Sequence, residues 1–87
     1  MNKESAIEFP CYFPIKIIGI NKASFQKEIT DIIQHYASEE NPPKITLKPS
    51  KEDRYLSITA TVYVMNQETL DNIYQEITKH PDIKMVL

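Results

Sequence analysis

Apolar and polar side chains alternate without interruption from Tyr55 to Val64. The apolar positions are Leu56, Ile58, Ala60, Val62 and Val64. The positions between them carry hydroxyls and aromatic rings: Tyr55, Ser57, Thr59, Thr61 and Tyr63. Successive side chains of a strand point to opposite faces of a sheet, so this pattern predicts a long strand with one apolar and one polar face. The apolar face needs a cover, and the polar face is left for water or a partner.

Two segments follow the helical period instead. Between residues 21 and 37, the apolar side chains fall on one helical face: Phe25, Ile29, Ile32, Ile33 and Tyr36. Asn21 or Ser24 can cap the start of this helix. A second helix is expected to start after a cap at Asn66 and to stop before Pro81. Its apolar stripe consists of Leu70, Ile73, Tyr74 and Ile77.

Three shorter segments are predicted to be strands. Residues 15–20 are rich in β-branched side chains, and Gly19 helps to end the segment. Residues 44–48 alternate and precede Pro49, which suits an edge strand because proline has no N–H to donate. Residues 83–87 form the last, short strand.

The first 13 residues are predicted to be a polar lead-in segment, followed by a single domain over residues 14–87. Pro10 and Pro14 are expected to prevent regular structure between Phe9 and Pro14. A chain of 87 residues forms a single domain with a thin core, which dimerisation would help to stabilise.

The resulting order is strand, helix, strand, strand, helix, strand. Two right-handed crossovers on one antiparallel sheet predict an α+β, ferredoxin-like βαββαβ fold with four strands and two helices on one face. In this topology the first and third strands are central, and the strand before Pro49 lies at an edge.

The side of the sheet away from the helices is called the open face here. Besides the polar positions of residues 55–64, it is expected to carry Lys16, Lys44, Thr46, Lys48 and Lys84. Adjacent Ile17 and Ile18 leave open which side of residues 15–20 points to the helices. The open face either is simply solvated, as lysines and threonines on strands often are, or it pairs with a second copy or receives an anionic ligand or partner.

Composition and charge disfavour several classes of function. The net charge of −2 argues mildly against a protein that mainly grips nucleic acid, although the strands can still be locally basic. No apolar run approaches the ~18–20 residues of a membrane span, and the first residues do not resemble a signal peptide. One cysteine fits a reducing cytoplasm, and one glycine excludes a phosphate-binding loop and a dinucleotide-binding turn.

No constellation for catalysis stands out. Cys11 lies near prolines with no histidine or basic cluster beside it in the sequence, so nothing activates a thiol nucleophile. His35 and His80 are expected at helix ends or on an outer helical face, and with one cysteine they give no metal-ligand spacing. We therefore expect no enzyme activity, no metal and no cofactor.

One turn is a candidate anion site. Lys48, Ser50, Lys51 and Arg54 place three cations and a hydroxyl around the connection between residues 48 and 55, although a mobile polar loop has the same composition. An RNA-binding face is disfavoured because Tyr55 and Tyr63 are roughly 26 Å apart along the strand, too far to stack neighbouring bases.

Several of these residues together resemble the YbeD family of small bacterial cytosolic proteins. The resemblance extends from about Phe9 to Leu87 and includes the strand ending at Gly19, the turn at residues 48–51, Tyr55 with Ser57, and the terminal Met85-Val86-Leu87. It implies a ferredoxin-like fold similar to the ACT regulatory domain, a non-enzymatic role and a link to lipoate regulation. It carries over no catalytic residue.

Three functions follow from these observations. The preferred one is a cytoplasmic regulatory domain that works by protein association, either with itself or with an enzyme of lipoate metabolism. The second is a sensor of a small anionic metabolite. The third, a binder of single-stranded nucleic acid, is disfavoured, and no membrane partner is expected.

Overall fold

The computed structural model describes residues 8–50 and 52–87. Its elements are β1 Cys11–Ile20, α1 Ala23–His35, β2 Lys44–Pro49, β3 Tyr55–Val64, α2 Gln67–Thr78 and β4 Ile83–Val86. This is the order predicted from the two periodicities in the sequence.

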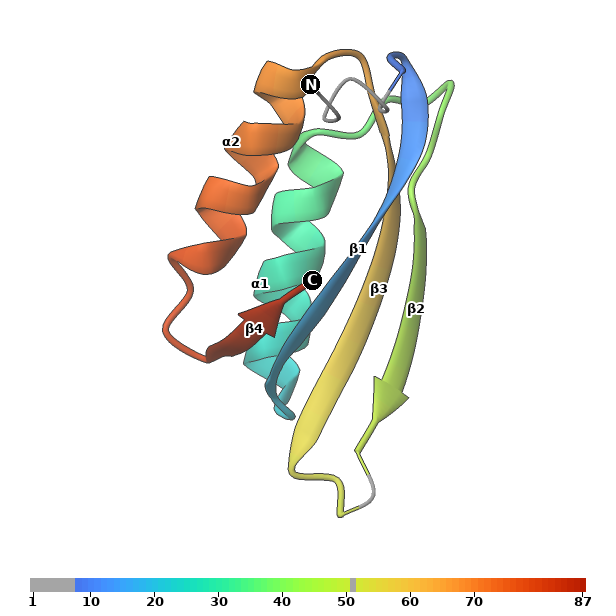
Figure 1. Ribbon diagram of the computed structural model, residues 1–87. Helices are drawn as coiled ribbons and strands as arrows, with labels where there is room; N and C mark the ends of the chain where they lie inside the picture. The colour runs from blue at the N-terminus through green and yellow to red at the C-terminus, as the bar shows by residue number, and fades with distance from the viewer. Residues whose placement is uncertain (1–7, 51) are drawn as a thin grey trace.

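The four strands form one antiparallel sheet in the order β2-β3-β1-β4. β1 and β3 are therefore central, and β2 is an edge strand that includes Pro49 as its last residue. Both helices pack on the same side of the sheet (Figure 1). The predicted ferredoxin-like βαββαβ fold is confirmed.

The core lies between the two helices and the covered face of the sheet. Its strand members are Ile15, Ile17, Leu56, Ile58, Ala60, Val62 and Val64, and its helix members are Phe25, Ile29, Ile33, Leu70, Ile73 and Ile77. Each of these residues is at most 5% exposed, and no polar or charged residue among those described is buried. The strict alternation of β3 thus separates the core from the open face.

β1 begins earlier than the sequence predicts. The strand starts at Cys11, so the expectation that Pro10 and Pro14 prevent regular structure up to residue 14 is wrong. Part of the predicted lead-in, from Cys11 to Phe13, pairs with β3 in the sheet. Residues 8–10 precede the strand, and residues 1–7 of that segment lie outside the described residues.

The position of Pro14 in the ladder explains why the strand tolerates it. Lys16 donates its N–H to a main-chain oxygen of Leu87 at 3.2 Å, and its carbonyl accepts from the Leu87 N–H at 2.8 Å. Backbone groups two residues apart in a strand point to the same side, so the Pro14 nitrogen also points away from β3. Pro14 precedes the part of β1 that pairs with β4, and its missing N–H therefore breaks no bond to β3.

Gly19 has a packing role rather than the predicted role of ending the strand, because β1 continues to Ile20. A Cβ atom at Gly19 would lie 2.3 Å from the Cζ atom of Phe25 and 2.7 Å from the carbonyl oxygen of Asp82. The missing side chain therefore lets the Phe25 ring and the turn before β4 approach the sheet closely.

The two helices start differently. Asn66 caps α2 as predicted, because its side chain accepts a hydrogen bond from a backbone N–H in the first turn. Lys22 occupies the N-cap position of α1 without a side-chain cap bond, so the predicted cap by Asn21 or Ser24 is wrong. The Asn21 amide instead donates to the Asp53 carbonyl at 3.0 Å and joins the start of α1 to the β2–β3 turn.

Candidate functional site

The orientation of β1 determines which of its residues reach the open face. Ile15, Ile17 and Gly19 are buried, whereas Lys16 is exposed and Ile18 is half-buried. Lys16 pairs with Thr59 and Ile18 with Ser57, so both lie on the open face with these β3 residues. The sequence did not determine whether Ile17 or Ile18 points to the helices. The structure shows that Ile17 does, so Ile18 adds an apolar residue to the open face.

β3 supplies the polar centre of this surface. Its outward residues Tyr55, Ser57, Thr59, Thr61 and Tyr63 are all half-buried. β2 aligns its exposed residues Lys44, Thr46 and Lys48 with Thr61, Thr59 and Ser57 in turn. The structure therefore places all of these sequence-predicted residues on one side of the sheet.

β4 contributes two neighbouring residues to the open face because its pairing with β1 is irregular. The register shifts within the ladder, as at a β-bulge. Ile83 and Val86 pack against the core, while Lys84 and Met85 are exposed. A bulge redirects side chains in this way, so two successive residues can serve the same face.

Charge is segregated between the strands and the helices. The four strands contain four lysines and no carboxylate: Lys16, Lys44, Lys48 and Lys84. The two helices contain five carboxylates and one lysine: Glu28, Asp31, Glu68, Asp71, Glu76 and Lys27. A chain with a net charge of −2 thus has a positively charged open face.

A shallow hollow of about 360 Å³ lies on the open face between β1, β3 and the end of β2. Its lining consists of Lys16, Ile18, Lys48, Pro49, Ser50, Tyr55 and Ser57. A second hollow of about 230 Å³ adjoins it, shares Ile18 and Tyr55, and is completed by Lys84 and Met85. Together they form one depression, called the Ile18 hollow below.

The strand register orders the residues of the Ile18 hollow. Lys48 pairs with Ser57, Ser57 with Ile18, and Ile18 with Met85, which gives one row across all four strands. At about 4.8 Å between strands, this row spans roughly 14 Å. The Lys84 ammonium lies 5.7 Å from the centre of the Tyr55 ring, within reach of a cation–π contact.

The turn predicted as an anion site is only partly assembled. Lys48 and Ser50 line the hollow, but Arg54 is not among its lining residues, and Lys51 lies outside the described residues. The Ser50 hydroxyl accepts a hydrogen bond from the Tyr55 N–H at 3.0 Å, so it closes the turn. Lys16, from a different strand, lines the hollow together with Lys48, whereas the sequence predicted Arg54 in this cluster.

The far end of the open face is aromatic. Tyr12, which is 49% exposed, packs edge-to-face against Tyr63 with ring centres 5.0 Å apart. Tyr55 lies at the other end of β3, so the tyrosines of the open face form two separate groups.

Sequence reasoning missed Ile18 and Met85. Ile18 follows another isoleucine, so its face could not be read from alternation. The outward orientation of Met85 depends on its pairing with Ile18, which is distant in the sequence. The sequence did contain one signal: residues 15–20 have more apolar side chains than one face of a strand can bury, so at least one of them had to lie on the open face.

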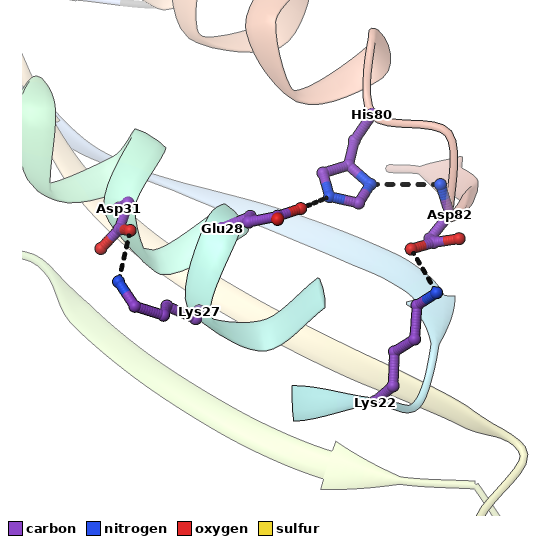
Figure 2. Close-up of polar contacts among 6 residues, drawn as sticks. All are labelled: Lys22, Lys27, Glu28, Asp31, His80 and Asp82. Atoms are coloured by element: carbon purple, nitrogen blue, oxygen red, sulfur yellow. Dashed lines mark hydrogen bonds and ion pairs between the residues drawn. The ribbon is translucent and has the colours of Figure 1, made fainter. Parts of the chain in front are cut away.

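His80 lies just beyond the C-cap of α2, near a helix end as predicted, but its side chain is largely enclosed. The His80 side chain is only 8% exposed, and its Nε2 lies 2.5 Å from the Glu28 carboxylate (Figure 2). Its Nδ1 accepts from the Asp82 N–H at 3.1 Å, which leaves the proton on Nε2 to be donated to Glu28. The ring packs edge-on against Phe25, so His80 is not on the outer helical face that the sequence also allowed.

The contacts of His80 and Asp82 have a structural role. Asp82 also forms an ion pair with Lys22 at 3.2 Å, which fixes the turn before β4 against the start of α1 (Figure 2). Within residues 8–50 and 52–87, no three histidine, cysteine or acidic side chains group as metal ligands. The half-buried Cys11 packs against the core.

The helix-covered sheet and the open face without helices define a small α+β domain with a ferredoxin-like fold. Residues 4–87 match the family described as "Protein of unknown function (DUF493)", and the chain belongs to this family. The resemblance to YbeD-like proteins is thereby confirmed.

Relatives cover nearly the whole chain. A UPF0250 protein of Neisseria meningitidis serogroup C is 42% identical over 86 residues, which cover 99% of this chain and 94% of the relative. A UPF0250 protein of Nitrosomonas europaea is 36% identical over 87 residues and all of both chains.

Solved structures support the same fold. Protein HP0495 from H. pylori superposes with a TM-score of 0.71 and 25% identity, covering 100% of this chain and 94% of that one. The ACT domain from GTP pyrophosphokinase of Chlorobium tepidum gives a TM-score of 0.69 at 20% identity, covering 88% of this chain and 83% of that one. The second likeness shows the fold alone. Neither helix in the described part of the chain has the length and apolar character to cross a membrane.

Proposed function

We propose that this chain is a non-enzymatic regulatory domain of the cytoplasm that acts by associating with a protein partner through its open face. The observation that supports the proposal is the segregation of charge. The strands carry four lysines and no acidic side chain, whereas the helices carry five acidic side chains. A positive patch attracts an acidic surface and steers its approach.

The same charge favours a different protein over a second copy at this face. Two open faces pressed together would bring the lysines of both copies into one interface, and like charges in contact disfavour association. Self-association through a sheet edge remains compatible with the proposal, because edge strands carry unpaired backbone groups.

The ACT-like fold is consistent with a regulatory role. In the Chlorobium tepidum protein, a domain of this shape belongs to an enzyme, GTP pyrophosphokinase. The likeness is an analogy for function and carries no residue across. A link to lipoate metabolism is a prediction that rests on the family resemblance alone.

The proposal is tested by comparing which proteins bind the chain and a charge-reversed variant. In the variant, Lys16, Lys44, Lys48 and Lys84 are all replaced by glutamate, and the control is Lys27→Glu on α1. We expect a specific protein to bind the original chain and the control but not the variant, with a matching increase of mass in solution. A strictly monomeric chain that binds no protein, or a partner that ignores the four substitutions, would contradict the proposal.

A second function, a sensor of a small anionic metabolite, is favoured by the Ile18 hollow with Lys16 and Lys48 at its edge. Titration with carboxylate and phosphate metabolites, followed by amide shifts, tests it. Shifts confined to the hollow and to the turn with Ser50, Lys51 and Arg54 would support a sensor, and unchanged spectra would exclude it.

A further inference from the structure

We propose that the Ile18 hollow holds an acidic segment of the protein partner, with one apolar side chain of that segment seated on Ile18 and carboxylates on either side of it facing the surrounding lysines. This inference rests on the proposed function, since it specifies which chemistry of the partner the open face recognises. It places the centre of recognition at one end of the sheet rather than over the whole face.

The floor of the hollow is apolar and partly exposed to solvent. Ile18 lies at its centre, Met85 is 50% exposed beside it, and the Tyr55 ring borders both. Strand pairing places these residues on the open face, and both described helices pack on the other side of the sheet (Figure 1). Seating an apolar side chain here would remove all three from water, which favours binding.

The floor is also held in place before binding. The Ser50 hydroxyl accepts from the Tyr55 N–H at 3.0 Å, and the Ser50 N–H donates to the Tyr55 carbonyl at 2.8 Å. The Lys84 ammonium lies over the Tyr55 ring from β4. A surface that is already ordered loses less conformational entropy when a partner docks.

Lysines surround this floor on three sides. Lys16 precedes Ile18 by two residues on β1, Lys48 lies in the same cross-strand row two strands away, and Lys84 lies on β4. The ion pairs between described residues involve Lys22, Lys27 and His80, and none uses these three lysines. Among the described residues, no carboxylate side chain lines the hollow. An apolar residue with acidic residues on both sides in sequence matches this arrangement in both polarity and charge.

The openness of the hollow favours a protein segment over a small molecule. Small-ligand sites typically bury about 70–90% of the ligand surface, which a shallow depression on a sheet does not achieve. A segment that continues past the hollow also contacts the hydroxyls of Thr46 and Thr59, which form the next row beside Lys16. This additional contact area compensates for the small area that the shallow hollow itself buries.

The test uses a blocked pentapeptide with leucine between two pairs of glutamates, titrated at low salt while amide shifts of the full chain are recorded. We expect weak binding, with a dissociation constant on the order of millimolar, since the peptide carries only the central contact. The shifts should centre on Ile18, Ser57 and Met85. Replacing the leucine by glycine, or the glutamates by lysines, should remove them.

Matched protein variants locate the site. Combining Lys16→Glu with Lys48→Glu should weaken peptide binding about tenfold, because each change replaces an attraction at the hollow with a repulsion. Lys44→Glu reverses the same charge on the same face, but Lys44 pairs with Thr61 and lies away from the hollow. The affinity of this variant for the peptide should therefore stay within about twofold of that of the original chain. Ile18→Thr keeps a β-branched residue on the strand and should weaken binding without unfolding the chain.

Three results would overturn the inference. The first is an absence of shifts at the hollow for the acidic peptide. The second is equal weakening by Lys44→Glu and by the hollow variants. The third is equal binding of glutarate, a small dicarboxylate, which would assign the hollow to a small anion. If a partner protein is lost only when all four strand lysines are reversed, the proposed function stands and this inference falls.

Discussion

Ile17 and Ile18 are adjacent residues of the same type in β1, yet they belong to two different surfaces. Ile17 is 0% exposed beneath the helices, and Ile18 lies on the open face among lysines and hydroxyls. The same contrast holds along β3, where buried and half-buried residues alternate over ten positions. The covered face accounts for stability and the open face is available for binding, so substitutions on the two faces should have separable effects.

The largest expected difference is between Ile17→Ala and Ile18→Ala. Removing the buried Ile17 side chain leaves a cavity in the core and should cost about 2–5 kcal/mol of the free energy of unfolding. The same truncation at Ile18 should cost no more than about 1 kcal/mol, the range of strand propensity on an exposed face. Denaturant unfolding of both variants measures the two values, and equal losses would show that the faces are assigned wrongly.

A smaller loss is expected from Gly19→Ala on the covered face. The added methyl meets the Phe25 ring and the Asp82 carbonyl, so the ring or the turn before β4 must shift. Overpacking of this kind typically costs about 1–3 kcal/mol. Thermal unfolding of Gly19→Ala beside the original chain checks this. An unchanged melting temperature for Gly19→Ala would mean that the close approach is absent in solution.

The open face should contribute little to stability. Lys16→Glu and Lys48→Glu change exposed side chains without ion-pair partners among the described residues, so each should alter the free energy of unfolding by no more than about 0.5 kcal/mol. Chemical denaturation provides the measurement. A loss of more than about 1.5 kcal/mol would be typical of a buried position and would contradict the separation between the two faces.

The smallest expected effect on stability comes from a hydrogen bond between Tyr36 and Glu76 on the solvent-facing side of the helices. The Tyr36 hydroxyl donates to the Glu76 carboxylate, and this hydrogen bond is the main cause that raises the pKa of Tyr36 above 10.0. Because folding raises this pKa, the contribution to stability is present below pH 10 and is lost as the pH rises through the pKa of the folded state.

Glu76→Gln should therefore lower the pKa of Tyr36 toward its ordinary value. The shift of the Tyr36 ring signals with pH measures it. Burial also raises the pKa of Tyr74, which does not depend on Glu76 and serves as the internal control. A Tyr36 titration that does not respond to Glu76→Gln would rule out this link between α1 and α2.

The sequence predicts the covered face better than the open one. Alternation in residues 55–64 identifies both sides of β3, since every second residue is apolar. It fails for β1, where consecutive isoleucines satisfy either orientation, and at Pro14, whose tolerance depends on how far β4 extends along β1. The candidate site was only partly predictable for the same reason. Lys48 and Ser50 are close in sequence, but Lys16 and Met85 join them only through strand pairing.

The most direct test of the binding face is a lysine-labelling comparison between the purified chain and the chain at native abundance in cells. Mass spectrometry after brief acylation reports the reactivity of each lysine separately. If the open face holds a partner, Lys16, Lys48 and Lys84 should be protected in cells, while Lys27 on α1 should react equally in both samples. Protection of Lys27 with unchanged reactivity at the three strand lysines would contradict the account.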